Sequence, residues 1–193
     1  MAGGQHIRII GGIARGRTVH TAHGDRVRPT AAAVREALAN IERARLRGAR
    51  VLDLCAGFGT VGLELLSQGA AEAVFIEKDR RTSDVVRENV AELGFDEAAE
   101  VWTNPAESAI DRLAAEGRVF DLVFVDPPYN QGLAPRLLER LAQRPEVLAA
   151  EGEVVFQHST HEPLPAREGP LERVRERRSG DTILSWYARK VEG

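Results

Sequence analysis

Apolar and polar residues alternate in blocks along the central part of the chain. From Val51 onward, short apolar runs are separated by amphipathic stretches, which is typical of βα units with a parallel sheet. Five strands are predicted in this part, over Val51–Cys55, Ala73–Glu77, Glu100–Thr103, Leu122–Asp126 and Glu153–Gln157. Four helices are predicted to connect them, over Thr60–Gln68, Arg80–Leu93, Pro105–Glu116 and Leu133–Gln143.

The C-terminal part follows a different period. Leu171–Arg178 alternates apolar and charged residues, and Thr182–Ala188 follows it after a Ser-Gly-Asp turn sequence. Two such runs predict an antiparallel hairpin, in which Trp186 and Tyr187 place one ring in the core and the other outward. With the five earlier strands, this hairpin predicts a Rossmann-like α/β fold with a mostly parallel, seven-stranded sheet.

The N-terminal residues are predicted to form a separate basic arm. Ile7–Ile10 and Gly16–His20 predict a small hairpin, and Ala31–Arg45 predicts a helix with Thr30 as its N-cap. Positions 1–50 carry ten arginines and three acidic residues, whereas positions 51–149 carry nine basic and eighteen acidic residues. This asymmetry suggests a polyanionic partner for an arm of residues 1–48, attached to a body of residues 49–193.

Composition limits the class of protein. The 193 residues, of which 43% are hydrophobic, suffice for one domain with a sizeable core. No apolar run is long enough for a membrane span, and the start MAGGQHIRII lacks the pattern of a signal peptide. The single cysteine, Cys55, excludes an internal disulfide framework. We therefore expect a cytoplasmic protein without membrane contact, and a monomer.

A glycine-rich loop follows the first strand of the body. In DLCAGFGTVG, the residues Gly57, Gly59 and Gly62 form a G-x-G-x-x-G pattern between a strand and a helix. Glu77 lies 20 residues after Gly57, where it can accept hydrogen bonds from ribose hydroxyls. This pattern alone favours a nicotinamide dehydrogenase. However, Asp53 precedes the loop, and its charge suits the cationic amino group of S-adenosylmethionine (AdoMet) better than a pyrophosphate.

A second motif ends the strand in FDLVFVDPPYN. An exocyclic amine on a base is a poor nucleophile, because its lone pair is delocalised into the ring. Asp126 and the carbonyl of Pro127 can accept its two hydrogens, and the adjacent Pro128 restricts the backbone so that this carbonyl is already oriented. Tyr129 can stack on the face of the base. The motif thus predicts a clamp for a planar amino group.

The two motifs together carry a family resemblance. The runs VLDLCAGFGTVGLELLSQGA, AVFIEKD and FDLVFVDPPY resemble class I AdoMet-dependent methyltransferases that carry a D/N-P-P-Y/F motif. IRIIGGIARGRTV, RPTAAAVREAL and SGDTILSWY narrow the resemblance, over nearly the whole chain, to the RsmD family of bacterial 16S rRNA guanine-N2 methyltransferases. The resemblance implies methyl transfer from AdoMet to the N2 amine of a guanosine in small-subunit rRNA.

The resemblance also implies the residues of the cofactor site. Glu77 is expected to hold the ribose, and Phe58, in place of a small residue, to pack on the methionine moiety. Asn104 departs from the family, because an acid that contacts the adenine amino group is usual there. The expected cofactor residues are Asp53, Cys55, Ala56, Gly57, Phe58, Gly59, Thr60, Glu77, Lys78, Asn104, Pro105 and Ala106.

The resemblance further implies an RNA substrate, within a small-subunit particle that offers contacts to ribosomal proteins. The residues expected to contact the RNA are Arg15, Arg17, Arg28, Pro29, Thr30 and Arg35. No metal is required, because the sulfonium of AdoMet supplies its own leaving group. His158 and His161, in QHSTHEP, are accordingly interpreted as solvent-facing loop residues.

Other functions remain open at this point. An adenine-N6 methyltransferase of DNA or RNA and a protein glutamine-N5 methyltransferase share the same clamp. A nicotinamide dehydrogenase is disfavoured by Asp53 and by the DPPY motif. A non-catalytic RNA-binding module has no need of a complete cofactor loop.

Overall fold

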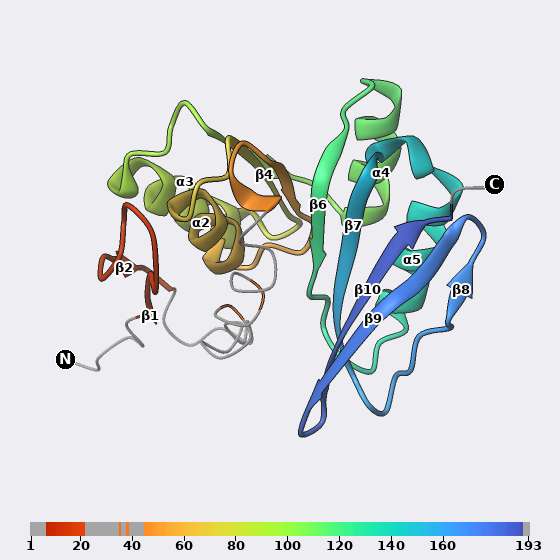
Figure 1. The fold of residues 1–193 in the computed structure, drawn as a ribbon. Helices are drawn as coiled ribbons and strands as arrows, with labels where there is room; N and C mark the ends of the chain where they lie inside the picture. The colour runs from red at the N-terminus through yellow and green to blue at the C-terminus, as the bar shows by residue number, and fades with distance from the viewer. Residues whose placement is uncertain (1–6, 22–34, 36–37, 39–44, 191–193) are drawn as a thin grey trace. The chain divides into compact units, whose positions relative to one another are not determined.

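The structure is a computed structural model that describes residues 7–21, 35, 38 and 45–190 (Figure 1). The chain divides into two compact units, Met1–Asn104 and Pro105–Gly193, each of which is described by itself. The helix predicted over Ala31–Arg45 and its N-cap Thr30 lie largely outside the described residues, although Arg35, Leu38 and Arg45 are helical. The predicted division after residue 48 stays a prediction.

A small hairpin opens the first unit, as predicted. Strands β1 (Ile7–Arg8) and β2 (Thr18–Val19) pair antiparallel, with Ile7 opposite Val19. The turn between them is fastened to helix α2 (Thr60–Ser67) by polar side chains. The buried carboxylate of Glu64 accepts the backbone N–H groups of Ile10 and Gly11, each at 2.8 Å. The hairpin is therefore held to the helix that follows the glycine loop.

Three parallel strands form the sheet of the first unit. Their order is β5 (Ala99–Thr103), β4 (Glu72–Glu77) and β3 (Arg50–Asp53). The central strand β4 is apolar throughout its middle, and its residues Ala73–Ile76 are buried. Helix α2 packs closely on it, because a Cβ at Gly62 would lie only 2.3 Å from a ring carbon of Phe75. Gly62 is thus required for the close approach of helix and strand.

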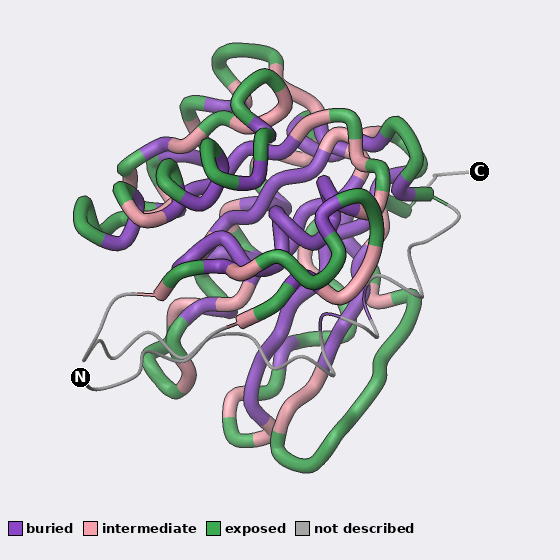
Figure 2. Tube along the Cα trace, turned by 90° about the vertical axis from the view of Figure 1, so that its left-hand side faces the viewer, coloured by how far each residue is buried: buried purple, intermediate pink, exposed green. Residues whose placement is uncertain are grey.

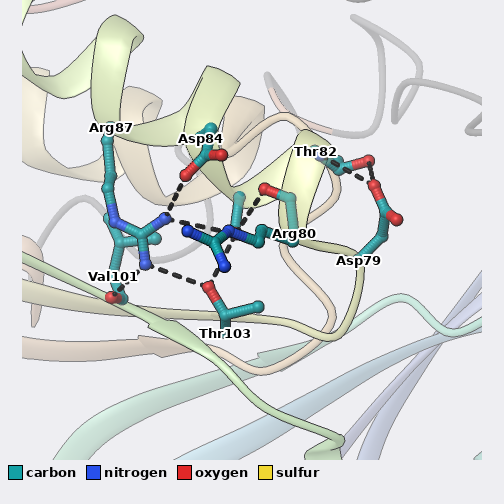
Figure 3. Close-up of polar contacts among 8 residues, drawn as sticks. Asp79, Arg80, Thr82, Asp84, Arg87, Val101 and Thr103 are labelled. Atoms are coloured by element: carbon teal, nitrogen blue, oxygen red, sulfur yellow. Dashed lines mark hydrogen bonds and ion pairs between the residues drawn. The ribbon is translucent and has the colours of Figure 1, made fainter.

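Helix α3 (Arg80–Leu93) has well-defined ends. Asp79 is its N-cap and accepts from the backbone N–H of Thr82 at 2.8 Å and from the Thr82 hydroxyl at 2.7 Å (Figure 3). Gly94 ends the helix in the left-handed conformation, with φ of 76°. The guanidinium of Arg87 joins the helix to β5 through the Val101 carbonyl and the Thr103 hydroxyl (Figure 3).

The second unit combines parallel and antiparallel strands. Its strand order is β6 (Phe120–Val125), β7 (Leu148–Ser159), β10 (Thr182–Arg189), β9 (Leu171–Ser179) and β8 (Arg167–Glu168). β6 and β7 are parallel, and the later pairs are antiparallel. Its helices are α4 (Ala106–Ala115), α5 (Leu133–Gln143) and the short 3₁₀ helix η1 (Pro145–Val147). β6, β7 and the middle of β10 are mostly buried, whereas most residues of β9 are exposed. Figure 2 shows the buried and exposed residues along the chain.

The predicted fold class is confirmed, with corrections in detail. Helices α3 and α5 have the predicted bounds, and the hairpin β9–β10 turns at Gly180-Asp181. The described strands after residue 49 number eight rather than seven, because the two-residue strand β8 pairs with the start of β9. Among the described residues, no helix is long and apolar enough to cross a membrane.

The prediction that one ring of Trp186-Tyr187 points outward is wrong. Both side chains are buried, because both faces of β10 are covered. Tyr187 packs edge-on against Phe156 at a centroid distance of 5.9 Å and donates to the Pro165 carbonyl. The Arg175 guanidinium lies 5.3 Å from the Trp186 ring centroid, on the side of the neighbouring strand β9.

Candidate cofactor loop and amine clamp

The glycine loop joins β3 to α2 in a tight turn. Gly57 and Gly59 have φ of 52° and 77°, which residues with a side chain rarely adopt. The backbone N–H of Gly59 donates to the Ala56 carbonyl at 2.7 Å, and that of Ala56 to the Ile76 carbonyl at 2.9 Å. The loop is therefore closed on itself and tied to the end of β4, as a nucleoside cradle requires.

Asp53 is directed inward, to the helix that follows the loop. Its Oδ2 accepts the backbone N–H of Gly62 at 2.9 Å, and the residue is 2% exposed. Gly59, the N-cap of α2, has no side chain with which to cap the helix. Asp53 thus supplies the missing acceptor from the preceding strand and places a negative charge at the helix N-terminus. Its predicted contact with the AdoMet amino group stays a prediction.

Glu77 joins the loop to the start of α3. Its carboxylate accepts the backbone N–H of Gly57 at 3.0 Å and that of Asp79 at 2.9 Å. Burial raises the pKa of Glu77 above its usual 4.5, against the opposing effect of these two hydrogen bonds. Glu77 is half-buried, and its predicted contact with ribose hydroxyls stays a prediction.

The other predicted cofactor residues differ in exposure. Cys55 is half-buried, Ala56, Phe58 and Thr60 are buried, and Lys78 is exposed. The backbone N–H of Asn104 donates to the Glu77 carbonyl at 3.1 Å, so the ends of β5 and β4 are adjacent. Pro105 and Ala106 belong to the second unit, where they begin α4. The cofactor contacts of these residues stay predictions.

Asn89 is a buried residue of the first unit that the sequence did not single out. Its side-chain amide donates to the carbonyls of Phe58 and His20, at 3.2 and 3.0 Å, and accepts the His20 N–H at 2.7 Å. It therefore joins the glycine loop to the chain just after the N-terminal hairpin. An asparagine at a buried position of an amphipathic helix is the signal that could have identified it.

The predicted RNA-contact residues fall into three groups. Arg15 is exposed, whereas the guanidinium of Arg17 donates to the carbonyls of Leu93 and Glu92 at the end of α3. Arg35 is 4% exposed, and burial lowers its pKa despite the nearby charge of Glu64. Arg28, Pro29 and Thr30 lie outside the described residues. An RNA role for any of the six stays a prediction.

The DPPY residues follow β6 in the second unit. Asp126 and Tyr129 are half-buried, Pro127 is buried and Pro128 is exposed. The Nε2 of Gln157, on β7, donates to Asp126 Oδ1 at 3.0 Å and to the Tyr129 hydroxyl at 2.8 Å. One buried amide therefore holds both polar side chains of the motif. A glutamine that ends the apolar run VVF in the predicted strand was the signal for it.

Glu162 fixes the backbone that follows the motif. Its carboxylate accepts the N–H of Asn130 at 3.1 Å and that of Gly132 at 2.7 Å. Asn130 has a φ of 58° and Gly132 a φ of 67°, so the chain makes a left-handed turn before α5. The motif is thus constrained at Asp126 and Tyr129 by one side chain and just beyond Tyr129 by another.

His158 lies in the core, and the prediction of a solvent-facing loop histidine is wrong for it. It is 1% exposed on β7, with Nδ1 3.0 Å from the Glu162 carbonyl and Nε2 2.9 Å from the Ser185 hydroxyl. The carbonyl can only accept, so Nδ1 carries the proton. Burial lowers the pKa of His158. His161 is exposed, and no metal-binding cluster of acidic, histidine or cysteine residues occurs in the described part of the chain.

Comparisons with known proteins agree with these motifs. Residues 7–188 match the family model described as "Conserved hypothetical protein 95". The Escherichia coli K12 protein "Ribosomal RNA small subunit methyltransferase D" is 35% identical over 192 residues, covering 100% of this chain and 94% of the relative. The Bacillus subtilis protein "Putative rRNA methyltransferase YlbH" is 32% identical over 184 residues, covering 95% of this chain and 100% of the relative.

Solved structures show the same fold. "Putative methyltransferase yhhF" from Escherichia coli matches with a TM-score of 0.85 and 33% identity, covering 97% of this chain and 99% of that one. An RNA methyltransferase from Salinibacter ruber, solved with S-adenosyl-L-homocysteine, matches in fold alone, with a TM-score of 0.65, 18% identity and coverage of 86% and 97%. The fold and motifs define a class I methyltransferase. Within that class, the chain belongs to the Conserved hypothetical protein 95 family, the RsmD-type family that its motifs predict.

Proposed function

We propose that this enzyme transfers a methyl group from AdoMet to the N2 amine of a guanosine in small-subunit ribosomal RNA. The observation that carries the proposal is the DPPY motif, whose Asp126 and Tyr129 side chains are both held by Gln157. Membership of a family that includes a small-subunit rRNA methyltransferase supports the substrate class.

The glycine loop fits AdoMet as the cofactor. AdoMet carries a ribose and an electrophilic methyl group on a sulfonium, and it has no phosphate. The Glu77 carboxylate, half-buried beside the loop, would hold the ribose hydroxyls. Gly57 and Gly59 keep the loop free of side chains where the backbone turns. The Asp53 carboxylate, which bonds to the first turn of α2, would repel a dinucleotide pyrophosphate bound at that helix N-terminus.

The clamp residues would activate the amine by orientation. Asp126 accepts one amine hydrogen and the Pro127 carbonyl accepts the other, which favours a pyramidal nitrogen whose lone pair faces the methyl donor. Tyr129 supports the plane of the base. The proton that the nitrogen loses after transfer passes to Asp126 or to water. A guanine must leave its stack, or come from unpaired RNA, to be held in this way.

The substrate RNA would be recognised in the cytoplasm, within a small-subunit particle. The ten arginines of residues 1–50 support contact with phosphates, of which exposed Arg15 is a described example. The acidic residues of 51–149 are suited to basic ribosomal proteins. We take the enzyme to act as a monomer.

The test is methyl transfer from labelled AdoMet to small subunits isolated from cells that lack the enzyme, followed by digestion to nucleosides. Label in N2-methylguanosine is the expected result. Label in N6-methyladenosine would overturn the base assignment, and label only in protein would favour a glutamine-N5 methyltransferase.

The roles of the residues are tested by Asp126→Ala. Turnover should fall by roughly a hundredfold or more, because the amine loses its charged acceptor. AdoMet affinity, measured by calorimetry, should be unchanged. Loss of AdoMet binding in a folded variant would contradict the assignment of Asp126 to the amine.

A further inference from the structure

The side-chain amide of Gln157 links the two ends of the DPPY motif. We propose that Gln157 is a positioning residue that sets the plane of the Asp126 carboxylate relative to the Tyr129 ring, so that both match the planar amine. This inference rests on the proposed function and adds to it a residue outside the motif.

Strand pairing brings Gln157 to this place. β6 and β7 are parallel, and their last pair is Val125 and Phe156, so the next positions along the two chains are Asp126 and Gln157. Neighbours across a ladder point to the same face of a sheet. On its other side Gln157 is opposite Leu184 of β10. The glutamine is therefore held between two strands, and its backbone cannot shift without disturbing both.

The orientation of the amide follows from its partners. Both hydrogens of Nε2 are used, one by Asp126 Oδ1 at 3.0 Å and one by the Tyr129 hydroxyl oxygen at 2.8 Å. Turning the amide over would bring Oε1 against a carboxylate oxygen, where two acceptors repel each other. Gln157 is 6% exposed, so water does not readily replace these bonds. A single rotamer is thus strongly favoured.

The Gln157 amide bonds to Asp126 and to Tyr129, the two residues on either side of the Pro127-Pro128 pair. Pro127 and Pro128 restrict the backbone from Asp126 to Pro128, but a backbone restriction does not by itself select the χ1 angles of Asp126 and Tyr129. Gln157 restrains those two side chains, and Glu162 restrains the backbone at Asn130 and Gly132. Residues of β7 and of the segment after it therefore contribute directly to the geometry of the amine acceptor and of the stacking ring.

The experiment compares Gln157→Leu with the wild-type chain on small subunits from cells that lack the enzyme. Leucine keeps a similar volume and removes both donors. We expect kcat to fall about ten- to a hundredfold, since misplaced reacting groups cost rates of that order. The Kd for AdoMet and the unfolding midpoint should change little. Gln143→Leu is the matched control, because Gln143 is exposed on α5 and its side-chain amide bonds to the side chains of Arg140 and Glu139.

Gln157→Glu provides a readout that a structural role would not give. A protonated carboxyl can still donate one hydrogen bond to Asp126, whereas an ionised one repels it. Activity of this variant should therefore be partly retained at acidic pH and be lost as the pH rises, whereas Gln157→Leu should be low at every pH. Full kcat in Gln157→Leu would overturn the inference and leave the proposed function intact.

Two further outcomes would also be decisive. A parallel loss of kcat, AdoMet binding and thermal stability in Gln157→Leu would show a structural role and overturn the inference. Failure of the wild-type chain to methylate the RNA would overturn the proposed function, and the inference with it.

Discussion

The Asp53 carboxylate accepts a hydrogen bond from the backbone of Gly62, nine positions further along the chain, at 2.9 Å. Because Asp53 ends β3 and Gly62 lies in the first turn of α2, this bond fixes both ends of the glycine loop. This bond restrains the loop without occupying its ligand-facing side, because it joins the strand before the loop directly to the helix after it. The charge of Asp53 therefore has a structural use in addition to its predicted use in cofactor binding.

Gly62→Ala should destabilise the chain by up to about 2 kcal/mol on balance, since overpacking of a core costs roughly 1–3 kcal/mol. The added Cβ would lie 2.3 Å from a ring carbon of Phe75, which is fully buried and cannot move aside. The helix propensity of alanine, about 1 kcal/mol better than glycine, offsets only part of this cost. Urea unfolding measures the effect. The same substitution in a Phe75→Leu background should cost less, and equal costs in the two backgrounds would contradict the steric explanation.

AdoMet binding should weaken as the pH falls into the range where Glu77 takes up a proton. Burial raises the pKa of this carboxyl, so protonation begins at a higher pH than for an exposed glutamate. The protonated form loses acceptor capacity for the ribose hydroxyls. The effect of Glu77 on the free energy of unfolding has the opposite pH dependence. A pKa that is raised in the folded state stabilises the fold at low pH, and this stabilisation is lost as the pH rises through the folded-state pKa.

Calorimetric titration of AdoMet between pH 7 and pH 4.5 checks the Glu77 prediction. The Glu77→Gln variant should bind AdoMet about tenfold or more weakly than the wild type at pH 7, as expected for loss of a charged acceptor. Its AdoMet affinity should change little further on acidification. An identical pH dependence in this variant would show that another group is responsible.

Arg17→Met should destabilise the first unit by about 0.3–1 kcal/mol, the usual effect of a cation at a helix C-terminus. The Arg17 guanidinium donates to the Leu93 carbonyl at 3.0 Å and to that of Glu92. Arg15→Met is the control, since Arg15 is exposed and donates to the Gly12 carbonyl from its backbone N–H, which the substitution keeps. Equal unfolding midpoints for the two variants in urea would count against a capping role for Arg17.

Stability should decrease as the pH falls below about 6.5, partly through His158. Burial lowers the pKa of this histidine from its usual 6.5, so the unfolded chain binds a proton before the folded chain does. The loss is roughly 1.4 kcal/mol per pH unit between the unfolded and folded pKa values, and it ends below the folded one. Above pH 7 the effect is absent.

Unfolding of His158→Gln across pH 5 to 7.5 measures this contribution. The variant should have a flatter pH dependence than the wild type, whatever its absolute stability. If unfolding of the His158→Gln variant had the same pH dependence as that of the wild type, groups other than His158 would be responsible.

Local pattern was sufficient for most of the elements and for the chemical motifs, although it did not predict the short strand β8. The amphipathic period of Arg80–Leu93 and of Leu133–Gln143 gave these two helices with the correct bounds. The glycine loop is one continuous stretch of sequence, and so is the DPPY motif. The residues within each motif are therefore neighbours in any fold that forms the strand before it. Hydrophobic periodicity and turn chemistry act over a few residues, and the sequence displays them directly.

Only the tertiary structure decided which distant residues support those motifs. Gln157 contacts Asp126 from 31 positions away, and Arg17 contacts the end of α3 from 76 positions away. His158, which the sequence suggested was exposed, is buried with its two ring nitrogens bonded to the Ser185 hydroxyl of β10 and to the Glu162 carbonyl. Such contacts depend on strand order and register, which result from packing of the whole sheet. No local pattern encodes them, because a polar side chain looks the same in the sequence whether its partner is water or a buried carboxylate.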